Sequence, residues 1–199
     1  MILLVNRFCR SLYSSSIGIY LIWSLVLNLK THKGRLDANG FRFAIVVSRW
    51  NDFLTSRLLE GAVSALESLG AKEDLVEVFM VPGSFELPGA AKKVAESGRF
   101  DAVITLGVVI RGETPHFDLV AGEAAKGVGQ ASFQSGIPVI FGVVTANTVE
   151  QAVNRCGVKS GNKGYEAAMA AVETASLYRE IEAKDDSSGL NARAVPHVV

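Results

Sequence analysis

A single histidine follows a proline where an apolar run ends, in the stretch "VVIRGETPHFDL" at residues 108–119. Thr114 and Pro115 are typical of a helix start, with threonine as the cap and proline at the first helical position. His116 would then lie in the first turn, where free N–H groups and the helix dipole favour an anion such as phosphate near residues 112–114. The dipole also disfavours a protonated imidazole, which suits a group that both accepts and donates protons. A lone histidine here is more often structural, so its candidacy depends on what else converges.

An aromatic side chain follows an earlier apolar run, in "SRWND" at residues 48–52. Trp50 could pack against the protein, or it could offer a stacking surface to a flat ligand. Asn51 or Asp52 is placed to cap the helix that follows.

A serine and a glutamate follow a second run, in "VPGSFELPG" at residues 81–89. Ser84 as a helix cap with Glu86 in the first turn is ordinary helix-start chemistry, and the alternative is that Glu86 binds ligand hydroxyls. A serine hydrolase using Ser84, His116 and Asp118 is poorly supported, because "GSFEL" lacks the second glycine of a nucleophile elbow.

Three cations follow the last run, among the glycines of "NRCGVKSGNKG". Arg155, Lys159 and Lys163 could form a solvated basic joint. They could equally reach a phosphate, with Arg155 as a two-pronged clamp and Lys163 as a point charge.

All these candidates lie at the ends of four apolar, β-branched runs that alternate with helical patterns. Such runs are typical of parallel strands covered on both faces, and the alternation implies right-handed crossovers. We therefore expect an α/β fold, a three-layer α/β/α sandwich around a central four-stranded parallel sheet. Ligands of such sheets bind outside the carboxyl ends of the strands. The expected strands are residues 41–48, 75–81, 101–110 and 137–145, and the expected helices are 53–70, 85–98, 116–136, 148–157 and 164–182.

Composition limits the function classes. The 199 residues include 20 acidic and 20 basic side chains, so no net basic field favours nucleic acid. Cys9 and Cys156 are the two cysteines, with no CxxC motif and no cluster of His and Cys, so we expect neither a disulfide framework nor a metal site.

Both ends of the chain differ from its middle. Residues 11–29 carry no charge and are flanked by Arg10 and Lys30. They read as a marginal membrane span, as a targeting peptide, or as an extension from an early start codon. We expect residues 1–36 to be an N-terminal extension, 37–181 to be the functional domain, and 182–199 to be an irregular C-terminal tail.

The blocks "SRWND", "VPGSFELP", "GVVIRGETPHFDLV", "PVIFGVVTANTVEQAVNR" and "GNKGYEAA" together resemble the lumazine synthase family of riboflavin biosynthesis. The resemblance spans about residues 41–181. It implies an oligomer of flavodoxin-like subunits that condenses 5-amino-6-(D-ribitylamino)uracil with 3,4-dihydroxy-2-butanone 4-phosphate. The products are 6,7-dimethyl-8-ribityllumazine, phosphate and water, and this is the penultimate step of the pathway.

The resemblance also implies a role for each site residue. His116 would shuttle protons, and Trp50 would stack on the pyrimidine where a phenylalanine is common in the family. The aminouracil and its ribityl chain would be held by Trp50, Ser84, Phe85, Glu86, Val108, Val109, Ile110, Phe141 and Lys163, and the phosphate by Gly112, Glu113, Thr114 and Arg155. In this family, residues such as Phe141 and Lys163 come from the neighbouring subunit.

The implied partners are the small-molecule substrates and further copies of the chain, as a pentamer, a decamer or a sixty-subunit shell. Riboflavin synthase is a further partner that the resemblance suggests. No cofactor is expected, because imine formation and loss of phosphate need only proton transfer and orientation. The expected location is the cytoplasm, and the alternatives are organellar targeting or membrane anchoring through residues 1–30. An archaeal-type riboflavin synthase, a lumazine- or flavin-binding homologue without turnover, and a membrane-anchored module are the rival functions.

Overall fold

The computed structural model describes residues 29–159 and 161–187, and the chain divides into two units, residues 1–33 and 34–199. Of the first unit only residues 29–33 are described, and they form neither helix nor strand. The apolar segment that suggested a membrane span or a targeting peptide therefore lies, except for Leu29, outside the described residues. None of the helices that are described has the length and apolar character needed to cross a membrane.

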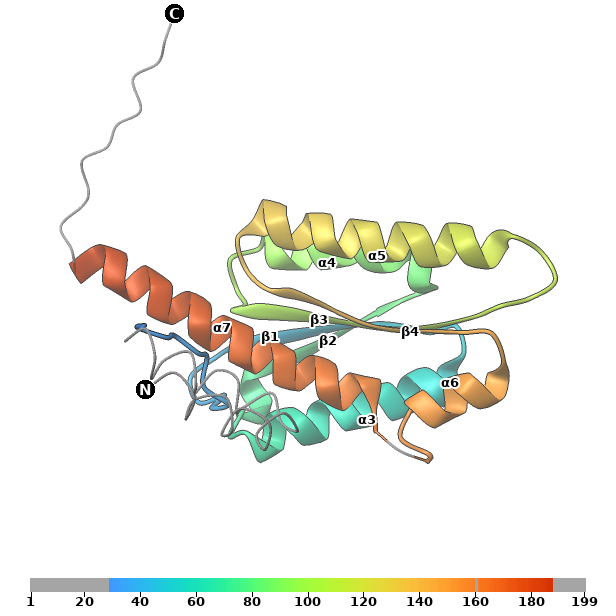
Figure 1. Cartoon of the computed structure of the whole chain (residues 1–199), viewed down its shortest axis with the longest axis horizontal. Coiled ribbons are helices and arrows are strands. Elements are labelled where there is room, and N and C mark those ends of the chain that lie inside the picture. Colours follow the sequence, from blue (N-terminus) through green and yellow to red (C-terminus); the bar gives the residue numbers. More distant parts are fainter. Residues whose placement is uncertain (1–28, 160, 188–199) are drawn as a thin grey trace, which may run out of the picture. The chain divides into compact units, whose positions relative to one another are not determined.

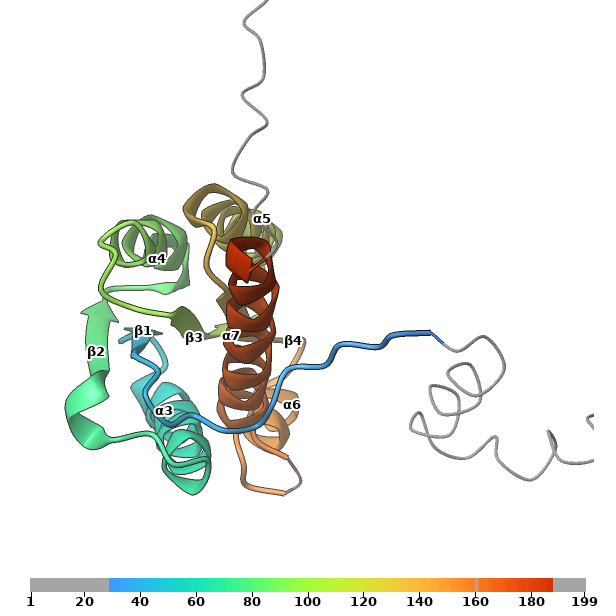
Figure 2. The same cartoon turned by 90° about the vertical axis from the view of Figure 1, so that its left-hand side faces the viewer.

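A four-stranded parallel sheet forms the centre of the second unit, as predicted. Its strands are β1 (Phe43–Ser48), β2 (Val76–Val81), β3 (Ala102–Ile110) and β4 (Val139–Ala146). They are arranged in the order β2-β1-β3-β4, which is visible end-on in Figure 2. Phe43 pairs with Val76 on one side and with Ala102 on the other, so the three amino ends are level. This is the strand order of a flavodoxin-like sheet.

Helices cover both faces of the sheet and complete the predicted three-layer sandwich (Figure 1). Helices α4 (Leu87–Ala95) and α5 (His116–Ser135) cover one face, and α3 (Asp52–Ser68), α6 (Val149–Arg155) and α7 (Lys163–Ser187) cover the other. Helix α7 continues past residue 181, where we expected the tail to begin, because no glycine or proline interrupts the chain before Gly189. Residues 188–199 of that tail lie outside the described residues.

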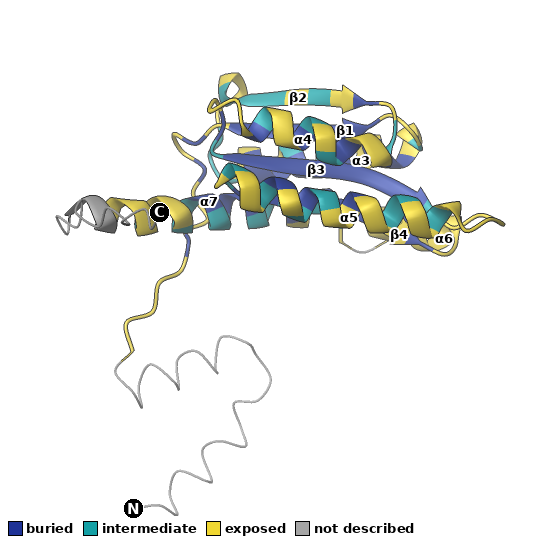
Figure 3. Ribbon diagram, turned by 90° about the horizontal axis from the view of Figure 1, so that it is seen from above, coloured by how far each residue is buried: buried dark blue, intermediate teal, exposed yellow. Residues whose placement is uncertain are grey.

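The two central strands contribute side chains to both layers of the core. Phe43, Ile45 and Val47 pack toward α3 and α7, whereas Ala44 and Val46 pack toward α4 and α5. Figure 3 shows β3 buried along its length and the edge strand β2 only partly covered. Because burying each large side chain contributes about 1.5–3 kcal/mol, the central strands anchor the fold.

The close contact between α3 and α7 fixes the position of the basic segment where α7 begins. Asn162 donates from Nδ2 to the carbonyl oxygen of Arg57 in α3 (2.8 Å) and accepts at Oδ1 from the backbone N–H of Gly164 (2.8 Å). A Cβ atom on Gly164 would overlap the carbonyl oxygen of Leu58, so only glycine fits there. The start of α7, including Lys163, is therefore fixed against α3.

Replacing Gly164 by alanine should force α7 away from α3 and lower the free energy of unfolding by about 1–3 kcal/mol. Gly129→Ala, in the middle of α5, is the matched control, because a Cβ there meets nothing within 4 Å. The control should be neutral or stabilising by up to about 1 kcal/mol. Urea unfolding at a fixed protein concentration measures both, and equal midpoints would contradict the close contact.

Candidate active site

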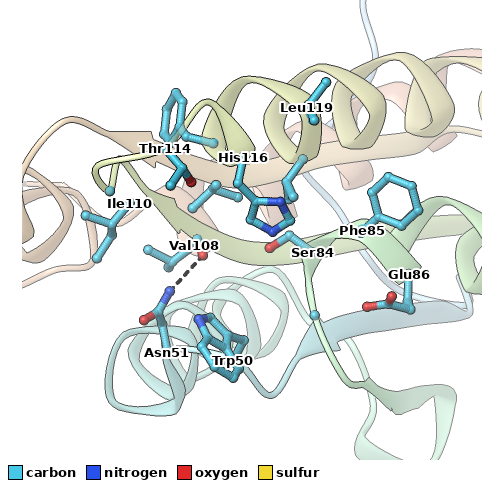
Figure 4. A pocket seen from close by; sticks show the side chains of 15 residues that line it. Trp50, Asn51, Ser84, Phe85, Glu86, Val108, Ile110, Thr114, His116 and Leu119 are labelled. Carbon is cyan, nitrogen blue, oxygen red and sulfur yellow. Dashed lines mark hydrogen bonds between the residues drawn. The ribbon is translucent and has the colours of Figure 1, made fainter.

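A cleft of about 690 Å³ opens at the carboxyl edge of the sheet (Figure 4). The loops after β1, β2 and β3 and the first turns of α5 form its walls. This volume lies in the range of small-molecule sites. Most of the predicted site residues line it, namely Trp50, Ser84, Phe85, Glu86, Val108, Val109, Ile110, Gly112, Thr114 and His116.

Exposed apolar side chains border the cleft. The side chain of Trp50 is 72% exposed, and Phe85 and Leu119 are more than half exposed. A tryptophan that packs into the core would be covered, so the exposure of Trp50 favours the stacking interpretation over the packing one. Its backbone N–H donates to the carbonyl of Pro82 (3.1 Å), which ties its loop to the β2 loop.

Ser84 is buried at the base of the cleft, where it begins the short helix η2 (Ser84–Glu86). Its predicted role as a helix cap is wrong, because Gly83 holds the cap position and no side chain caps η2. Among the described residues, its hydroxyl has no hydrogen-bond partner. A Cβ on Gly107 in β3 would lie 2.6 Å from this hydroxyl oxygen, so glycine makes the room that it occupies. An unpaired buried hydroxyl costs about 1–3 kcal/mol, which a ligand hydroxyl could recover.

His116 is the first residue of α5, and its imidazole projects into the cleft (Figure 4). The predicted cap is wrong by one residue, because Pro115 occupies the cap position and Thr114 lines the cleft instead. In the described part of the chain no side chain caps this helix. The backbone N–H of Asp118 donates to the carbonyl of Pro115 (3.0 Å), and those of His116 and Phe117 stay available to an anion at the loop of residues 112–114.

Asp118 does not complete a catalytic triad with His116. Its two carboxylate oxygens accept from Nη1 and Nη2 of Arg111 at 2.9 and 2.7 Å. This hydrogen bonding by Arg111 lowers the pKa of Asp118 below its ordinary value. Because the pKa of Asp118 is lowered, the ion pair is fully formed above the ordinary carboxyl pKa and is lost only as the pH falls through the lowered pKa. The carboxylate is therefore paired with Arg111 and not with His116 at neutral pH, which counts further against the serine hydrolase alternative.

Asn51 lines the cleft, a role that the sequence patterns did not identify. It holds the cap position of α3, one of the two positions that we expected, in a left-handed backbone conformation (φ 61°), but its side chain makes no cap hydrogen bond. Instead, Nδ2 donates to the carbonyl of Val108 in β3 (3.0 Å; Figure 4). Asparagine tolerates this conformation better than most residues, and that was the available signal. The walls also include Gly83, Phe117, Leu119 and Val120.

Four predicted site residues do not line the cleft. Glu113 is exposed on the adjacent loop, and Arg155 is the exposed last residue of α6. Lys163 begins α7, with its Nζ 3.3 Å from a carboxylate oxygen of Glu166. Phe141 on β4 packs against the core beneath α4 and α5. A single copy of the chain therefore does not bring these cations to the imidazole.

Comparison with known proteins identifies the family of the chain. The family model for 6,7-dimethyl-8-ribityllumazine synthase matches residues 40–179. The protein named 6,7-dimethyl-8-ribityllumazine synthase in Clostridium kluyveri is 54% identical over 154 residues, which cover 77% of this chain and 100% of the relative. The chain belongs to the 6,7-dimethyl-8-ribityllumazine synthase family. The family resemblance read from the sequence is confirmed.

The lumazine synthase match contains the whole cleft. It begins just before β1 and ends within α7, so residues 1–39 and 180–199 lie outside it. Across residues 29–159 and 161–187, no three His, Cys, Asp or Glu side chains group together in a way that could hold a metal ion.

Asn51→Gly should lose the hydrogen bond to Val108, while Asn51→Ala should also strain the left-handed backbone. We expect the glycine variant to lose about 0.5–1.5 kcal/mol of unfolding free energy. The alanine variant should lose about 1 kcal/mol more. Denaturant unfolding of the two variants beside the natural chain gives both values, and an alanine variant more stable than the glycine variant would contradict the backbone argument.

Proposed function

We propose that this chain condenses 5-amino-6-(D-ribitylamino)uracil with 3,4-dihydroxy-2-butanone 4-phosphate to give 6,7-dimethyl-8-ribityllumazine, phosphate and water. The proposal rests on one observation in a chain of this family. A single cleft is lined by an exposed indole, a buried hydroxyl without a partner among the described residues, and a histidine at a helix start that no side chain caps. These groups match a flat ring, a polyhydroxylated chain and a phosphate, respectively.

The aminouracil occupies the part of the cleft between the β1 and β2 loops. The exposed indole of Trp50 stacks on the pyrimidine ring. The hydroxyl of Ser84 and the carboxylate of Glu86 bond to the ribityl hydroxyls, beside the ring of Phe85. Backbone groups of Val108, Val109 and Ile110 read the polar edge of the uracil, because they lie where β3 reaches the cleft.

The phosphate of the second substrate binds at the start of α5. Backbone N–H groups of Gly112, Glu113 and Thr114 face it, together with the positive end of the helix dipole. The imidazole of His116 takes a proton from the attacking amine and returns protons as water and phosphate leave. Because the reaction needs only addition, elimination and ring closure, orientation of the two substrates accounts for much of the rate.

A second protomer completes the site. Arg155, Phe141 and Lys163 lie outside the cleft of their own chain, which supports their delivery to the cleft of a neighbour. Such a head-to-tail contact is heterologous and closes into a ring. We infer self-association to a pentamer, or to a decamer or sixty-subunit shell built from pentamers, in the cytoplasm.

A coupled assay of the full chain with both substrates should show lumazine formation by absorbance and fluorescence. His116→Ala should lower kcat by about 100-fold or less, since binding and orientation of the substrates survive. Lumazine binding without turnover in the natural chain would instead identify a binding homologue. Equal kcat values for the variant and the natural chain would remove His116 from the mechanism.

Mixing two impaired variants tests the shared site. His116→Ala and Arg155→Met chains, unfolded and refolded together, should regain activity in about a quarter of the sites of a random equal mixture. Each regained site takes His116 from one chain and Arg155 from the next. Arg155→Met alone should mainly raise KM for the phosphate substrate. Activity of the mixture equal to the mean of the two separate variants would contradict a site built from two protomers.

A further inference from the structure

Arg111, the first residue after β3, makes directed contacts with four other residues. Besides the two bonds to Asp118, its Nε donates to Oδ1 of Asn147 (3.1 Å), and its guanidinium lies 4.1 Å from the centre of the Phe117 ring. Its backbone N–H donates to the carbonyl of Ala146 at the end of β4 (2.9 Å). One residue thus joins the ends of two strands to the start of a helix.

These contacts hold both ends of the phosphate loop. Asp118 lies two residues after His116 in the first turn of α5, and Phe117 lines the cleft. Between the two anchor points, residues 112–114 make no hydrogen bond with the rest of the described chain. The ion pair therefore closes the loop from Arg111 to Asp118 and restrains the direction in which His116 enters the cleft.

The guanidinium of Arg111 is also linked, through Asn147, to helix α6, which ends in Arg155. The backbone N–H of Asn147 donates to Oε1 of Gln151 (2.9 Å), and Thr148 caps α6 by accepting from the Gln151 N–H (3.2 Å). Helix α6 then runs to Arg155. A rotation of α5 at its start would consequently disturb α6 as well.

Arg111 itself does not line the cleft described above. Three of its five side-chain N–H groups donate to Asp118 and Asn147. Both partners of the ion pair are well exposed, so the pair adds little to stability. Its consequence is geometric, because a misplacement of about 1 Å at a reacting group can cost roughly 100-fold in rate.

We propose that Arg111 is a positioning residue for this condensation, which sets His116 and the phosphate loop through Asp118 and Asn147. The inference rests on the function proposed above. It assigns a role in that function to a residue that contacts neither substrate.

The test compares Arg111→Met with Arg99→Met. Arg99 is a matched control, because it also pairs with a carboxylate (Glu77, 3.1 Å) and lies over a phenylalanine ring (Phe100, 4.8 Å), yet it lies away from the cleft. We expect Arg111→Met to lower kcat about 10-fold and to raise KM for the phosphate substrate, with KM for the aminouracil within about twofold. Arg99→Met should leave all three parameters unchanged.

The partner variant separates positioning from a general loss of folded protein. Asp118→Ala should reproduce the split between the two KM values, and the double variant with Arg111→Met should be no worse than either single one, since both remove the same restraint. Arg111→Lys, which keeps the charge and loses the fork, should recover only part of kcat. Arg111→Met kinetics equal to those of Arg99→Met, or additive effects in the double variant, would overturn the inference. Absence of turnover in the natural chain would instead overturn the proposed function.

Discussion

The burial of β1 and β3 on both faces is the constraint on which the arrangement of the chain depends. Strands that bury both faces need helices above and below, so each strand must be followed by a crossover that covers one side. Parallel strands joined in this way all end at the same edge. The loops that begin with Arg49, Pro82 and Arg111 therefore meet there, although they are far apart in the sequence.

Several local features at that edge would be costly in isolation. An indole stays exposed, a serine hydroxyl is buried without a partner in the described chain, and α5 begins without a side-chain cap. Each leaves an interaction unmade, and natural chains keep such features mostly where a ligand makes the missing interaction. Their convergence in one cleft gives all three a common explanation.

Two of the predicted cations, Arg155 and Lys163, do not line the cleft of their own chain. The loop proposed to bind phosphate lies at the start of α5 on one face of the sheet, while Arg155 and Lys163 lie on α6 and α7 on the other. Asn162 fixes the start of α7 to α3, so Lys163 does not swing to the cleft of its own chain. The proposed ring of identical subunits would account for these placements, because it would bring one face of a subunit to the edge of the next.

The sequence by itself determined the sheet, the helices that cover it and most of the cleft. The spacing of apolar residues and the positions of glycines are properties of neighbouring residues along the chain. The strands could therefore be predicted, and so could the positions of Trp50, Ser84 and His116 directly after them. Only the tertiary structure decided the details that involve partners far away in sequence. The side chain of Asn51 bonds to β3 instead of capping a helix, and Asp118 pairs with Arg111 instead of His116. Ser84 does not hold the cap position of its helix. Arg155 and Lys163 lie outside the cleft for the same reason, since side-chain direction and distance across the sheet are set by packing and not by spacing along the chain.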